Sequence, residues 1–255
     1  ANSNVAVGAA ALGANTTGAN NTAVGDNALL ANTTGGDNVA VGALAGDALT
    51  TGSDNVVLGK NALSADTAGR RSVAIGRSAL SAQNFTSTTS SYNVAVGYVA
   101  GGAVTTGTLN TLIGGLTGDA LTTGGENVAV GYNALSTEDT GVGNVAIGRN
   151  ALTTANYDGA GYNTAVGYIA GAAVTTGVQN TLVGAQAGDA LTDSDRNTAV
   201  GFQALTADTL GQYSTAIGYF ALGSQNFTSG TDAYNTGVGY SAGAAVTTGT
   251  ENTIM

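Results

Sequence analysis

The strongest constraint on this chain is a five-residue motif, Asn/Ser-x-Ala-Val-Gly, that recurs at intervals of about seventeen residues. It begins at Asn4, Asn21, Asn38, Asn55, Ser72, Asn93, Asn110, Asn127, Asn144, Asn163, Asn180, Asn197, Ser214, Asn235 and Asn252. The intervals after Ser72 and Ser214 are four residues longer than the others, and the interval after Asn144 is two residues longer. A period this short cannot hold two packed helices, and units rich in Val, Thr and Gly form poor helices. The repeat therefore predicts an all-β chain.

Each motif has the alternation of a β-strand. In the unit that starts at Asn127, Val128 and Val130 should face one side of the strand, and Asn127 and Ala129 the other. A second apolar patch, such as Ala134-Leu135, predicts a second short strand in each unit. One unit cannot bury its own Val pair, but stacked units can if equivalent strands pair in parallel about 4.8 Å apart. We therefore expect a parallel β-solenoid, or β-roll, of about fifteen seventeen-residue coils, with the valines as its internal spine.

Two kinds of residue should then recur for structural reasons. Stacked Asn side chains can form a ladder of amide hydrogen bonds, and we expect one at Asn21, Asn38, Asn55, Asn93, Asn127, Asn163 and Asn197. Gly serves where the backbone needs a positive φ or approaches another segment closely, and we expect turns at Gly25, Gly42, Gly59, Gly97, Gly131, Gly167 and Gly201. The ladder and turn positions are more easily explained by backbone structure than by binding.

The repeats also predict the domain organisation. Residues 1–255 should form a single repeat array, in which the three longer intervals close larger units of four coils at 21–92, 93–162 and 163–234, with partial repeats at both ends. We expect this array to be a fragment of a longer fibre.

Composition argues against most kinds of chemistry. The chain has no His, Cys, Trp or Pro, and six basic residues stand against sixteen acids, for a formal net charge of -10. These absences predict no enzyme activity, no cofactor, no metal site and no nucleic-acid partner. No apolar run is long enough to span a membrane. Asp193 and Asp195 beside Arg196 leave a calcium site as an alternative, although a solvated turn explains them better.

The enlarged coils concentrate aromatic residues in a chain that has few. These coils are candidate recognition loops. Their candidate contact residues are Phe85, Tyr92, Tyr157, Tyr162, Phe227 and Tyr234. Exposed aromatics beside Asn and Asp suit contacts with sugars or proteins. The alternative is that an aromatic ring folds down to cover the neighbouring coil.

Several motifs resemble those of a known family. Ser72-Val73-Ala74-Ile75-Gly76, Asn144-Val145-Ala146-Ile147-Gly148 and Ser214-Thr215-Ala216-Ile217-Gly218 resemble the head repeats of trimeric autotransporter adhesins of the YadA type. The resemblance implies a left-handed parallel β-roll packed as a homotrimer. The stretches Asn163–Tyr168 and Asn235–Tyr240 look more like arrays in phage tail-fibre proteins. The seventeen-residue unit is longer than the usual adhesin repeat, which leaves the coil cross-section and the trimer packing open.

The predicted outer face of the motif strand gives separate support for self-association. It carries Ala at positions such as Ala23, Ala40 and Ala129, and a small apolar stripe on a Thr- and Asn-rich protein suggests packing against another roll. We expect a homotrimer or a fibre.

The function expected from these features is a non-enzymatic structural and adhesive fibre segment, outside the cell, at the cell surface or on a virion. As a rigid rod it would present a surface for attachment to cells, glycans or matrix. A phage tail-fibre shaft is the first alternative. An ice-binding solenoid is a further one, which the Thr pairs favour but the lack of a regular Thr-x-Thr row disfavours.

Overall fold

A computed structural model describes residues 3–255. The first two residues of the predicted 1–255 array lie outside the described part. The chain divides into two compact units, Ala1–Asn127 and Val128–Met255, and each is considered by itself. Both are stacks of coils joined by parallel strand pairing, and no helix occurs in residues 3–255. The predicted class, a parallel β-solenoid of about fifteen coils, is confirmed.

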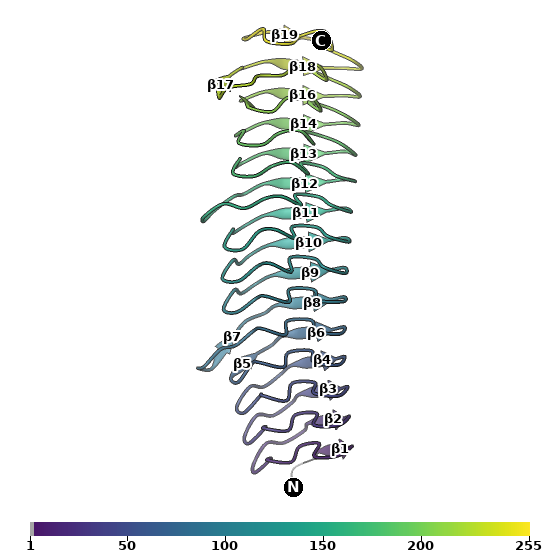
Figure 1. The fold of residues 1–255 in the computed structure, drawn as a ribbon, viewed down its shortest axis with the longest axis vertical. Helices are drawn as coiled ribbons and strands as arrows, with labels where there is room; N and C mark the ends of the chain where they lie inside the picture. The colour runs from purple at the N-terminus through teal and green to yellow at the C-terminus, as the bar shows by residue number, and fades with distance from the viewer. Residues whose placement is uncertain (1–2) are drawn as a thin grey trace. The chain divides into compact units, whose positions relative to one another are not determined.

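In the first unit, one three-residue strand from each coil pairs in register with its equivalent in the next coil. These sheet strands are β1 (Val5–Val7), β2 (Thr22–Val24), β3 (Val39–Val41), β4 (Val56–Leu58), β6 (Val73–Ile75), β8 (Val94–Val96) and β9 (Thr111–Ile113). The enlarged coil adds a separate pair, β5 (Gly69–Arg70) and β7 (Thr89–Ser90). In Figure 1 this pair lies on the side of the stack away from the sheet.

The second unit repeats this arrangement (Figure 1). Its sheet strands are β10 (Val128–Val130), β11 (Val145–Ile147), β12 (Thr164–Val166), β13 (Thr181–Val183), β14 (Thr198–Val200), β16 (Thr215–Ile217), β18 (Thr236–Val238) and β19 (Thr253–Ile254). Its last enlarged coil adds β15 (Gly211–Gln212) paired with β17 (Thr231–Asp232). The coil between β11 and β12 forms only an isolated bridge, from Val142 to Ala160.

The prediction of two strands in every coil is wrong. The Ala-Leu patch after each motif forms turns, because alternate residues adopt positive φ: Asn133 at 60° and Leu135 at 53°. A strand needs extended φ throughout, so two left-handed residues in three positions prevent one. The sequence shows little of this, because Leu is an unusual residue in the left-handed region.

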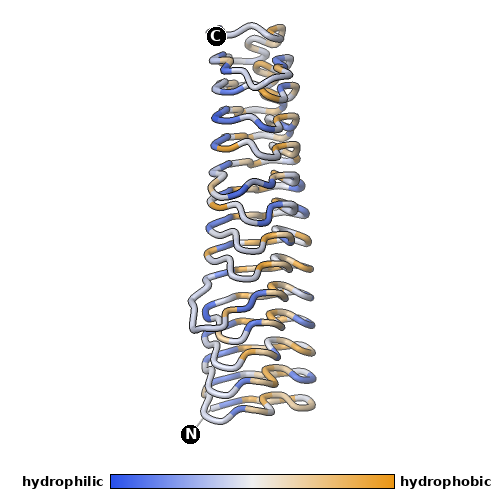
Figure 2. Tube along the Cα trace, turned by 60° about the vertical axis from the view of Figure 1, so that its left-hand side comes forward, coloured by the Kyte–Doolittle hydropathy of each residue, from blue (hydrophilic) through white to orange (hydrophobic). Residues whose placement is uncertain are grey.

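The prediction that Val lines the interior is also wrong. In β10 the central Ala129 is fully buried, whereas Val128 and Val130 are half-buried on the outer face. Exposed fractions reach 57% at Val7 and 40% at Ile113. The Ala stripe that suggested packing against another roll is therefore internal. Figure 2 shows hydrophobic residues recurring along each stack. They lie on this outer face as well as in the core.

Three positions per coil fill the interior, and their volumes compensate. Coils with a buried Leu in the turn after the motif, such as Leu135, have Ala in the strand centre, apart from Val57 in the coil of Leu63. Three positions after that Leu they have a polar or small residue, such as Glu138. Coils with Gly in that turn carry larger side chains elsewhere. A Cβ on Gly188 would lie 2.7 Å from Leu182 Cδ2 and 2.8 Å from Leu191 Cδ1. A large side chain at one interior position is thus accompanied by a small residue at another position of the same coil, as close packing requires.

The structure places the predicted ladder asparagines inside the coils, at most 1% exposed. Each links neighbouring coils. Asn38 Nδ2 donates to the Gly52 carbonyl at 2.9 Å, and Asn38 Oδ1 accepts from the Asn55 N–H at 3.0 Å. The same pattern recurs through both units. This ladder satisfies backbone groups that would otherwise be buried without partners.

The seven predicted turn glycines all have φ between 133° and 146°. They are also packed against the next coil. A Cβ on Gly131 would lie 2.6 Å from the carbonyl oxygen of Gly148. Both the conformation and the close approach of backbone to backbone exclude other residues here.

Candidate recognition surface

The six aromatics predicted as recognition residues fall into two groups. Phe85, Tyr157 and Phe227 are each only 6% exposed. Their rings fold into the coil, so they are not available as a contact surface. Tyr92, Tyr162 and Tyr234 are 49%, 57% and 52% exposed and remain candidates.

The buried rings cover a carboxylate that the sequence analysis missed. Asp66 Oδ1 accepts hydrogen bonds from the backbone N–H of Gly69 at 3.0 Å and of Phe85 at 3.1 Å. Its Oδ2 accepts from Gln83 Nε2 at 2.6 Å, and Gln83 Oε1 accepts from Asn93 at 2.9 Å. Asp208 makes the same contacts with Gly211, Phe227 and Gln225. The acid three residues before a turn Gly was the available signal.

The middle enlarged coil uses a different set of residues. Glu138 Oε1 accepts from the backbone N–H of Asp139, Thr140 and Gly141, at 2.7 to 3.2 Å. Its Oε2 is buried without a partner among the described residues, and desolvation raises the pKa of this carboxyl. The Tyr157 hydroxyl donates to Asn144 Oδ1, and burial raises the pKa of Tyr157. These networks hold the enlarged coils in place.

The exposed tyrosines belong to a column formed by the residue before each motif. Arg71 lies over the Tyr92 ring, 5.5 Å from its centroid, and Arg71 Nη1 donates to the Tyr92 hydroxyl at 2.8 Å. Tyr213 and Tyr234 stack with centroids 5.2 Å apart. The Asp232 carboxylate beside Tyr234 raises the pKa of that phenol. The column therefore presents stacked rings with charged groups at their edges.

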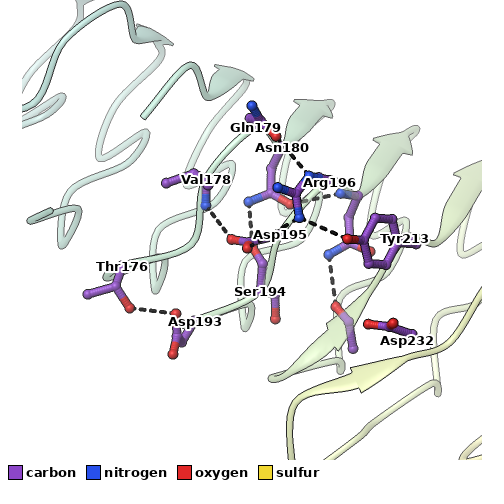
Figure 3. A network of polar contacts seen from close by, with 12 residues as sticks. Thr176, Val178, Gln179, Asn180, Asp193, Ser194, Asp195, Arg196, Tyr213 and Asp232 are labelled. Carbon is purple, nitrogen blue, oxygen red and sulfur yellow. Dashed lines mark hydrogen bonds and ion pairs between the residues drawn. The ribbon is translucent and has the colours of Figure 1, made fainter. Parts of the chain in front are cut away.

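Figure 3 shows the acidic turn that was considered as a calcium site. Asp193 Oδ1 accepts from the Thr176 hydroxyl at 2.7 Å, and Asp195 Oδ1 accepts from the Val178 N–H at 2.8 Å. Arg196 reaches Gln179 and the Tyr213 hydroxyl, both at 2.9 Å. The carboxylates thus bridge coils. Within residues 3–255, no group of three or more acidic side chains lies close enough together to hold a metal ion.

A second aromatic column follows the motif Gly. Its members are 44% to 80% exposed: Tyr98, Tyr132, Tyr168, Phe202, Tyr219 and Tyr240. In the second unit Phe202 stacks on Tyr219 at 5.6 Å and Tyr219 on Tyr240 at 5.1 Å. Arg149 lies over Tyr168, 5.8 Å from the centroid. Sequence analysis placed no recognition residue in this column.

Three acids of the Gly-Asp-Ala-Leu segments lie partly inside the coils. Burial raises the pKa of the carboxyls of Asp47, Asp119 and Asp189. Asp189 accepts a hydrogen bond from the Thr206 hydroxyl at 2.6 Å. One of them lies in each stretch of four coils, so the raised pKa values follow from the repeat.

The described part of the chain contains no helix that could span a membrane. Comparisons of the sequence with family models and with curated proteins, and of the structure with solved structures, found no match.

Proposed function

We propose that this chain is a non-enzymatic structural and adhesive segment of an extracellular fibre, displayed at a cell surface or on a virion. The observation that carries the proposal is the register of its exposed side chains. Parallel pairing without slippage repeats the same surface position in every coil, so an apolar column runs along each unit and aromatic columns run along the second. The Asn ladder makes each coil dependent on its neighbours, which favours a stiff array.

The adhesive contact is assigned to the exposed tyrosines of the enlarged coils, Tyr92, Tyr162 and Tyr234. Beads coated with the full chain should adhere to cells, glycan or matrix, and changing these three tyrosines to Ser should reduce adhesion at least several-fold. A matched control changes Tyr98, Tyr132 and Tyr240, which are 53%, 53% and 80% exposed. Equal adhesion by both triple variants would refute the assignment, and no adhesion by the parent chain would refute the function.

We also propose self-association as a homotrimer, now through the outer face of the sheet. In place of the Ala stripe, this face presents Val, Ile and Leu columns, with Val39 at 38% and Val41 at 39% exposure. An apolar column of this length is unusual on the surface of a monomer. Sedimentation or light scattering should give three times the chain mass, and Val39→Lys with Val41→Lys should shift it toward one. A monomeric parent chain would refute the trimer.

The proposal covers two kinds of fibre segment, a bacterial adhesin head and a phage tail-fibre shaft. The YadA-like motifs support the first, and the Asn163–Tyr168 stretch supports the second. Sequencing the whole gene tests them: a stalk with a membrane anchor supports the adhesin, and a chaperone domain after the array supports the tail fibre.

One observation favours ice binding as a second candidate. A regular Thr column occupies the first position of successive strands in the second unit: Thr164, Thr181, Thr198, Thr215, Thr236 and Thr253. In every one of these strands except the last, a β-branched apolar residue follows two positions later on the same outer face, about 6.6 Å along the strand. Regularly spaced hydroxyl and methyl groups on a flat sheet suit ordered water. Thermal hysteresis that Thr198→Lys abolishes would support this candidate, and none in the parent chain would reject it.

A further inference from the structure

In the second unit, two positions of the second aromatic column have no ring, Arg149 and Ala185. Arg149 lies over Tyr168, so it is the short side chain of Ala185 that leaves a gap. Strands β12, β13 and β14 are consecutive in the sheet, and Val166, Val183 and Val200 pair in register (Figure 1). The glycines that follow them stack directly, since a Cβ on Gly184 would lie 2.6 Å from the Gly201 carbonyl carbon. Tyr168, Ala185 and Phe202 therefore occupy the same position in three successive coils, and the middle one has no ring.

The width of this gap follows from the coil spacing. Two coil steps separate Tyr168 from Phe202, which is about 9.6 Å at the usual separation of paired strands. The same column shows what one ring per coil looks like, because Phe202, Tyr219 and Tyr240 stack at 5.6 and 5.1 Å with interplanar angles of 15° and 7°. A ring over Ala185 would sit at similar distances from both walls.

Both walls of the gap are held in place from behind. Arg149 lies over Tyr168, 5.8 Å from its centroid, with Nη1 3.4 Å from the hydroxyl. Tyr219 stacks on Phe202, with ring centroids 5.6 Å apart. The walls are exposed, at 49% and 44%, so an incoming ring would cover apolar surface that now faces water. Preorganised walls reduce the entropy lost on binding.

Neutral amides follow two of the three positions of the gap in the sequence. Gln186 follows Ala185 and Gln203 follows Phe202, and Gln203 Nε2 donates to Gln186 Oε1 at 3.1 Å. An amide offers donors and acceptors in one plane, which suits neighbouring hydroxyls. A pyranose ring carries C–H groups on both faces and hydroxyls at its rim. It is also thicker than an aromatic ring, which suits a gap with about 4.8 Å on each side.

We propose that the gap at Ala185 is a subsite for one neutral pyranose ring of a glycan, stacked between Tyr168 and Phe202. This inference rests on the proposed adhesive function and names its ligand class at a surface outside the enlarged coils. The amides of Gln186 and Gln203 orient the hydroxyls at the rim of the ring.

The most specific variant fills the gap. Ala185→Tyr supplies the missing ring, and its neighbours already stack in the required way, so the fold should be retained. The matched control is Ala43→Tyr, at the same position of the first unit but between Asp26 and Lys60. Saturation-transfer NMR with methyl glycosides of glucose, galactose, mannose and N-acetylglucosamine reports contact with the ring C–H groups. Circular dichroism confirms that each variant is folded.

The expected result is transfer to at least one glycoside by the full chain, unchanged in Ala43→Tyr and reduced at least tenfold in affinity in Ala185→Tyr. The proposal is overturned if no glycoside binds, if Ala185→Tyr binds as the parent does, or if only an aromatic probe such as N-acetyltyrosinamide binds. The bead assay separates the two hypotheses. Adhesion without glycoside binding refutes the subsite alone, and glycoside binding without adhesion refutes the adhesive function alone.

Discussion

The compensation of volumes inside the coils makes a quantitative prediction about Leu182 and Gly188. Leu182 is the buried centre of β13, and its side chain occupies the space that a side chain at Gly188 would need. Leu182→Ala should cost about 2 to 5 kcal/mol through lost burial and the cavity left behind. Gly188→Leu should cost about 1 to 3 kcal/mol through overpacking. The left-handed backbone adds about 1 to 2 kcal/mol for a residue with a Cβ, and Leu205 shows that Leu adopts it, with φ of 56° where Gly188 has 55°.

The double variant should cost much less than the sum of the two single changes. It reproduces two of the three interior positions of the next coil, in which Ala199 and Leu205 are both fully buried, while Leu191 stays where that coil has Asp208. We expect a favourable coupling of about 1.5 to 3 kcal/mol, in the upper range for side chains in contact. Because a repeat array need not unfold in one step, the assay is urea-dependent hydrogen exchange, followed by mass spectrometry of peptides from 163–201.

The control pairs Leu182→Ala with Lys60→Leu, an exposed position in the other unit, where the costs should add. A double variant at Leu182 and Gly188 that loses the sum of the single costs, within about 0.5 kcal/mol, would refute the packing account.

Three further predictions address separate features. Glu138→Gln should stabilise the protein at pH 7. Burial raises the pKa of Glu138 in the folded state, so its ionisation opposes folding as the pH rises through that value, and the gain seen by thermal melting should shrink in acid. Gly131→Ala should destabilise far more than Gly159→Ala in urea titrations, because both have positive φ but only Gly131 would place a Cβ against the next coil, 2.6 Å from the Gly148 carbonyl. Asn38→Ala should cost about 1 to 3 kcal/mol for each partner it leaves unpaired, and the loss of exchange protection should be confined to adjacent coils.

The repeat explains why the fold was predictable and its interior was not. A period of seventeen with one alternating strand leaves few structures besides a stack of parallel coils. Alternation defines two faces, but Val and Ala are both apolar, so it does not say which face is inside. Asn127 lies on the same face as Ala129, and Asn is buried far less often than Val, which favours the wrong face. The Asn is buried because the ladder satisfies its polar groups.

The candidate surface was predicted less completely. The enlarged coils followed directly from the longer intervals, and their exposed tyrosines follow the pattern of the residue before the motif. The burial of Phe85 is the alternative given above for the aromatics of the enlarged coils, and choosing it requires the partner of the Phe85 backbone N–H, Asp66, nineteen residues earlier. The aromatic column with its gap at Ala185 depends on which residues lie at the same position in neighbouring coils. The alignment of the motifs gives these positions, but they are neighbours in space only because the coils stack in parallel.

The central claim is that Ala lines the interior of the coils and Val the outside. Because the chain has no Cys, single thiols can be introduced at two neighbouring positions of β14, as Ala199→Cys and Val200→Cys. The measurement is the rate of thiol alkylation in dilute folded protein, divided by the rate in urea. We predict strong protection at position 199, where the side chain is fully buried, and much faster reaction at position 200, where it is half-buried on the outer face. Equal rates, or faster reaction at 199, would contradict the account.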